Sequence, residues 1–126
     1  MLADTTATLA GDQATLVIRR ITPDDADSSV FDWTVDDDMN GGYRIDTAHA
    51  GLDGSSRFLH VLSTDGAVTT AIASHAGSQL GVELTLAGNG MVRVRFETDS
   101  PGGELLLDGA VIPLAPGVSS LPVLAN

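Results

Sequence analysis

Oxygen-bearing side chains at alternate positions form the most suggestive chemical pattern of this chain. Asp36, Asp38 and Asn40 are spaced two residues apart and precede Gly41, which permits a sharp loop. Calcium takes its oxygen ligands from loops of this kind. The twelfth position of the full motif, where a bidentate Glu belongs, is Thr47. The favoured interpretation is a solvated acidic loop, and a calcium site at Asp36, Asp38 and Asn40 is the alternative.

His60 lies in a run whose two sides are both apolar. Phe58 and Leu62 share its side, and Leu59 and Val61 face the other way. Such a strand is covered on both faces, or it lies on a surface that meets another domain. We expect a packed, hydrogen-bonded His60 rather than a catalytic base, because the sequence places no nucleophile or second carboxylate beside it.

The remaining polar and aromatic residues predict no catalytic group. His49 and His75 have neither the spacing of a zinc site nor that of a triad. Runs of Asp at 24–25 and 36–38 would be exposed, whereas a glycosidase needs one carboxyl whose pKa a buried setting raises. Aromatic platforms for sugars are scarce, and we expect Phe31 and Trp33 in the core.

The charge balance argues against polyanionic partners. The chain has 17 acidic and 6 basic residues in 126, and a formal net charge of -11. All the basic residues are Arg, and they are scattered along the chain, whereas nucleic acids and anionic bilayers bind clustered cations. No stretch reaches the ~18 apolar residues that span a bilayer. We therefore expect neither nucleic-acid binding nor membrane insertion.

Short strand patterns dominate the chain, and no window keeps a helical apolar period. Turn formers at Asp65-Gly66, Gly88-Asn89-Gly90 and Asp108-Gly109 predict antiparallel hairpins. The sequence predicts a single all-β domain over residues 1–126, an antiparallel β-sandwich of about ten short strands with little or no helix. The expected strands are 14–21, 30–35, 43–46, 57–63, 67–73, 80–87, 91–97, 104–107 and 110–114, with a weaker pattern at 118–123.

Three of these strand patterns, over about residues 11–66, resemble the C-terminal β-domain of heparinase II/III-like polysaccharide lyases. They are Leu16-Val-Ile-Arg-Arg-Ile-Thr-Pro23, Gly42-Tyr-Arg-Ile-Asp46 and Arg57-Phe-Leu-His-Val-Leu62. Tyr43 replaces the usual Trp, and Asp46 replaces the usual Glu. The later residues are similar only as a generic series of hairpins.

The resemblance implies a domain cut from a larger multidomain protein. In that family a helical toroid and a central β-domain carry the lyase chemistry, and this chain contains neither. It implies a non-catalytic accessory domain that packs against the catalytic domains of its parent, which would be periplasmic or secreted and act on a polysaccharide. The alternative is a free-standing carbohydrate-binding or adhesion module assisted by calcium.

Overall fold

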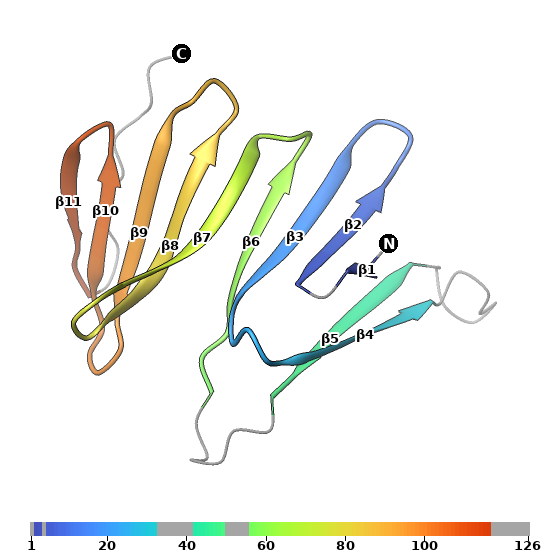
Figure 1. Ribbon diagram of the computed structural model, residues 1–126, viewed down its shortest axis with the longest axis horizontal. Coiled ribbons are helices and arrows are strands. Elements are labelled where there is room, and N and C mark those ends of the chain that lie inside the picture. Colours follow the sequence, from blue (N-terminus) through green and yellow to red (C-terminus); the bar gives the residue numbers. More distant parts are fainter. Residues whose placement is uncertain (1, 4, 33–41, 50–55, 117–126) are drawn as a thin grey trace. The chain divides into compact units, whose positions relative to one another are not determined.

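A computed structural model describes residues 2–3, 5–32, 42–49 and 56–116 (Figure 1). These residues form eleven strands and no helix, so none of them belongs to a helix that could cross a membrane. Every strand pair is antiparallel. The prediction of an all-β, antiparallel fold of short strands is confirmed.

The chain divides into two compact units, Met1–Gly66 (unit 1) and Ala67–Asn126 (unit 2). That residues 1–126 form one β-sandwich domain stays a prediction.

Unit 1 contains a four-stranded sheet and a separate hairpin. The sheet has the order β1-β2-β3-β6, and β4 pairs with β5 (Figure 1). The strands are β1 (Leu2–Ala3), β2 (Thr6–Ala10), β3 (Thr15–Thr22), β4 (Asp27–Asp32), β5 (Tyr43–Ala48) and β6 (Leu59–Thr64). The β4–β5 hairpin is thus inserted between two strands that are neighbours in the sheet.

The long β3 strand organises unit 1. Its β-branched run favours an extended strand, and it pairs with β2 on one side and β6 on the other. Arg20 lies opposite His60 in this register, and the pairing shifts between Arg20 and Thr22. A bulge of this kind bends the strand and re-aims its side chains. The apolar core beside it is small, with Ala7, Ala26 and Val61 buried.

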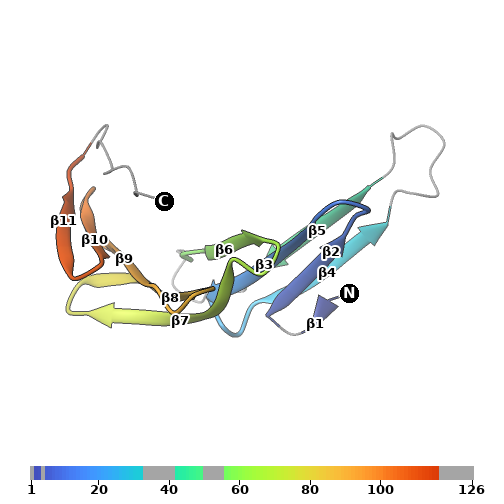
Figure 2. The same cartoon turned by 90° about the horizontal axis from the view of Figure 1, so that it is seen from above.

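Unit 2 is one five-stranded meander in the order β11-β10-β9-β8-β7. Its strands are β7 (Val68–Ala76), β8 (Gln79–Leu86), β9 (Met91–Glu97), β10 (Gly103–Leu107) and β11 (Ala110–Leu114). Figure 2 shows that this sheet bends, with β10 and β11 turned away from the plane of β7 and β8. Bending follows from the right-handed twist of strands.

The two faces of the unit 2 sheet differ in chemistry. Val82 lies opposite Val94, and Val94 lies opposite Leu105, so apolar side chains line up on one face. Val82 and Leu105 are buried. Glu83 lies opposite Arg93 on the other face. Alternation along each strand therefore separates an apolar face from a charged one.

The predicted turns have different outcomes. Gly88-Asn89-Gly90 joins β8 to β9, and Asp108-Gly109 joins β10 to β11, as hairpins. Asp65-Gly66 does not form the predicted hairpin, because β6 pairs with β3 and β7 pairs with β8. Asp65 instead bonds to Thr15: its amide donates to the Thr15 carbonyl at 2.9 Å, and its carboxylate accepts from the Thr15 amide at 3.0 Å.

The strands do not all match the expected ranges. The strand predicted at 30–35 begins earlier, at Asp27, and Asp32 is the last of its described residues. Strand β2, which was not predicted, pairs with β3 over five positions. The pattern at 118–123 lies outside the described residues.

Candidate functional site

The predicted calcium ligands Asp36, Asp38 and Asn40 lie outside the described residues, as does Trp33. Within the described ranges, no group of three or more His, Asp or Glu side chains could hold a metal ion. The calcium site therefore stays a prediction.

Arg20 is the buried charge of unit 1. Its residue is 9% exposed. One terminal nitrogen, NH1, donates to Ser28 Oγ at 2.7 Å, and the other, NH2, donates to the Asp24 carbonyl at 3.2 Å. Ser28 Oγ in turn lies 3.5 Å from Thr47 Oγ1. These contacts join β3 to the β4–β5 hairpin through polar groups.

A small cavity adjoins this guanidinium. It measures about 20 Å³ and is lined by Arg20, His60, Thr5, Thr6, Ser28 and Thr47, together with three apolar side chains. Arg20 Nε is buried and has no hydrogen-bond partner among the described residues. The half-buried His60 thus lies beside this cavity, while Leu62 on the same strand is 63% exposed. Of the two arrangements expected for this strand, cover on both faces does not hold at Leu62 within the described residues, and a surface that meets another domain stays a prediction.

A second polar cluster brings Asp25, His49 and Ser56 together. His49 Nδ1 lies 2.8 Å from Ser56 Oγ, and His49 Nε2 lies 3.2 Å from Asp25 Oδ1. No sequence pattern indicates this triad-like order, because its members are 24 and 7 residues apart along the chain.

The exposure of this second cluster favours a structural role. The Asp25 side chain is 73% exposed, so water screens its attraction to the imidazole. A catalytic triad instead buries the carboxylate that fixes the histidine tautomer. We interpret the cluster as a structural contact between the turn before β4 and the segment after β5.

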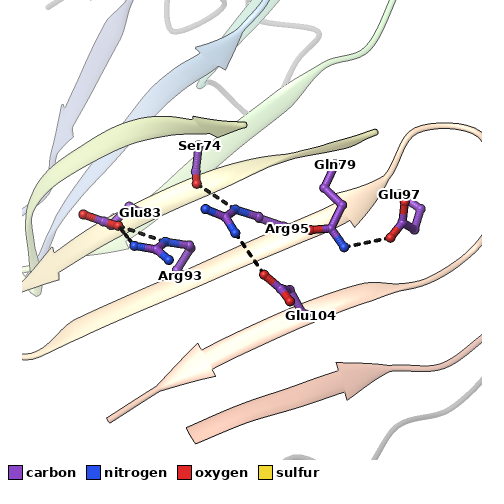
Figure 3. Close-up of polar contacts among 7 residues, drawn as sticks. All are labelled: Ser74, Gln79, Glu83, Arg93, Arg95, Glu97 and Glu104. Carbon is purple, nitrogen blue, oxygen red and sulfur yellow. Dashed lines mark hydrogen bonds and ion pairs between the residues drawn. The ribbon is translucent and has the colours of Figure 1, made fainter. Parts of the chain in front are cut away.

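Unit 2 carries a ladder of charged and amide side chains across its polar face (Figure 3). Arg93 Nε donates to Glu83 Oε2 at 2.9 Å, and a second nitrogen of the same guanidinium contacts that oxygen. Gln79 Nε2 donates to Glu97 Oε1 at 2.7 Å. Cross-strand pairs of this kind stabilise a sheet and fix its register.

Arg95 reaches farther than its neighbours in the ladder. Its Nε donates to Ser74 Oγ at 2.9 Å, and its NH1 donates to Glu104 Oε1 at 3.1 Å (Figure 3). Ser74 is on β7, two strands away, and Gly81 is the residue between them in register. A Cβ at Gly81 would lie 1.8 Å from the Val94 carbonyl oxygen. Only glycine therefore fits this position, and its missing side chain leaves Arg95 room to cross β8.

Large apolar side chains are exposed in both units. In unit 1, Phe58 is 47% and Leu62 63% exposed; in unit 2, Ile72 is 63% and Val111 62% exposed. No large side chain among the described residues is fully buried. Each of these side chains would gain stability from burial against another surface.

Phe31 is not a core residue, contrary to expectation. It is 42% exposed. The Arg44 guanidinium carbon lies 4.4 Å from its ring centroid, within the range of a cation–π contact. Phe31 and Arg44 are opposite each other in the β4–β5 register, which explains the contact. Tyr43, on the same hairpin, is 54% exposed.

No protein-family model, curated protein or solved structure matches this chain.

Proposed function

We propose that this chain is a non-catalytic accessory β-domain of a heparinase II/III-like polysaccharide-degrading protein, and that it packs against catalytic domains encoded elsewhere in its parent. The motif resemblance supports this proposal. Its three patterns fall on β3, β5 and β6, which all belong to unit 1. Two of these strands, β3 and β6, are paired neighbours.

The observation that carries the proposal is the exposed apolar surface. Leu62, Ile72 and Val111 each expose more than half of their surface, although they lie in regular strands. Burying an exposed leucine or isoleucine side chain is worth about 1.5–3 kcal/mol. Burial of any one of these side chains against a neighbouring domain would therefore stabilise the parent protein, whose domains meet at interfaces of their own.

The test is to sequence the surrounding gene and then reconstitute the parent from two pieces. The catalytic segment and this chain are produced separately and mixed on a size-exclusion column. Co-elution that is lost in a Leu62→Asp variant, and kept in an Asn89→Asp variant at the β8–β9 turn, is the expected result. A reading frame that encodes only these 126 residues would contradict the proposal.

The second candidate function is a carbohydrate-binding or adhesion module. The exposed aromatic rings of Phe31 and Tyr43 favour it, since flat rings stack on sugar faces. Calcium bound through Asp36, Asp38 and Asn40 would assist such binding. A melting curve with and without calcium tests that part, because a ligand at 100 times its dissociation constant adds about 2.7 kcal/mol of stability.

A further inference from the structure

We propose that the cavity beside Arg20 in unit 1 is a binding site for a monatomic anion such as chloride. The inference is independent of the proposed function. It rests on an incompletely bonded buried cation, on the donors around the cavity and on the size of the cavity.

The buried charge of Arg20 lacks a charged partner among the described residues. At 9% exposure its guanidinium has lost most of its hydration, and a buried charge is costly unless it is paired and hydrogen-bonded. Its partners among the described residues are a hydroxyl and a backbone carbonyl, both neutral. Its Nε has no partner there. An anion in the adjacent cavity compensates the charge and accepts the remaining N–H bond.

The lining supplies hydrogen-bond donors and no carboxylate. Four hydroxyl residues and His60 surround the cavity with Arg20, and no Asp or Glu is among its described lining residues. Because Ser28 Oγ accepts from Arg20, its own proton can go to Thr47 Oγ1. The Thr47 proton is then available to the cavity. Hydroxyls, an imidazole and a guanidinium can all donate hydrogen bonds to an anion, and no carboxylate of the described lining repels it.

The acidic residues nearby in sequence do not cancel this attraction. Asp24, Asp25 and Asp27 are exposed, so water and salt screen their carboxylates. The buried Arg20 is screened much less. The local field in the cavity is therefore set by the guanidinium rather than by the net charge of the chain.

The size of the cavity narrows the ligand class. A volume of about 20 Å³ is room for one water-sized particle. It is large enough for a water molecule or a monatomic anion. Water is therefore the competing occupant.

The test is thermal unfolding at constant ionic strength in sodium chloride or sodium gluconate. Chloride should raise the midpoint by about 4 °C relative to gluconate, since a ligand that binds only the native state stabilises it. The Arg20→Met variant should lose this difference between anions. Arg19→Met is the matched control, because Arg19 is on the other face of β3, near Ser63, and should keep it.

A direct readout covers the case in which Arg20→Met fails to fold. The ³⁵Cl NMR line of free chloride should broaden when wild-type protein is added, and bromide should reverse the broadening. Thr47→Val, which removes one hydroxyl and keeps the shape, should reduce the effect several-fold. Equal midpoints in chloride and gluconate, together with no excess line width, would overturn the proposal and leave water as the occupant.

Discussion

Arg20 of unit 1 and the two arginines of the unit 2 ladder are bonded in opposite ways. In unit 2, Arg93 and Arg95 are half-buried on a sheet face, and each contacts a glutamate on an adjacent strand. In unit 1, Arg20 is buried, and its described bonds go to a hydroxyl and a carbonyl. Unit 2 also pairs each strand with its sequence neighbour, whereas unit 1 closes β3 on β6 across an inserted hairpin. Where neighbouring strands in the sequence pair, as in unit 2, the strand register alone places each arginine beside a glutamate. Where β3 pairs with the distant β6, as in unit 1, the buried Arg20 depends on the inserted hairpin for its hydrogen bonds.

The largest expected effect is at Gly81 in unit 2. Replacing Gly81 with alanine should lower the free energy of unfolding by about 3 kcal/mol, because the new Cβ meets backbone atoms of the next strand that cannot move aside. Urea denaturation of the two proteins measures this loss.

Gly90 provides the matched control for that change. A Cβ there would make ordinary contact with the Leu86 side chain at 3.7 Å. Gly90→Ala should leave the stability unchanged or raise it by up to about 1 kcal/mol. If both alanine variants behaved alike, the close approach of β8 and β9 at Gly81 would be wrong.

The next effect concerns the dependence of unit 1 on its hairpin. Ser28→Ala removes the acceptor of the 2.7 Å bond from Arg20 and should cost about 2 kcal/mol, the usual loss for a hydrogen bond to a buried charge. Ser29→Ala, an exposed neighbour on the same strand, should change stability by less than about 0.5 kcal/mol. Chemical denaturation of both variants decides whether Arg20 relies on this contact.

The smallest expected effect is the difference in coupling energy between an ion pair of the ladder and an exposed surface pair. A double-mutant cycle on Glu83 and Arg93 should give a coupling energy of about 0.5–1 kcal/mol, because their side chains are only 34% and 28% exposed. The Arg44–Asp46 pair of unit 1 is 48% and 46% exposed and should give about half as much or less. A larger coupling at Arg44–Asp46 would remove the distinction between the two surfaces.

Much of the strand content could be predicted from the sequence, and for a physical reason. The β8–β9 hairpin has strong alternation on both strands and a glycine-rich turn, so local signals agree with the final pairing. Strand β2 has small residues and weak alternation, and its pairing with β1 and β3 defines it. Asp65-Gly66 has hairpin chemistry, but β6 finds its partner in β3. Turn residues alone do not reveal non-local competition of that kind.

The candidate sites were less predictable than the strands. Arginine is rarely buried, so nothing in the run Arg19-Arg20 indicates which of the two turns inward. The inward position of Arg20 depends instead on the bulge in β3 and on the inserted hairpin. The cluster of Asp25, His49 and Ser56 likewise depends on where two turns meet. Contacts between distant loops leave no periodic signal in the sequence.

The proposed accessory role depends most directly on whether exposed apolar side chains become covered in the parent protein. Carbene footprinting of the isolated chain and of the intact parent compares their accessibility residue by residue. We expect labelling of Leu62, Ile72 and Val111 to fall several-fold in the parent, while Asn89, in the exposed β8–β9 turn, stays equally labelled. Equal labelling of all four residues in both proteins would contradict the account.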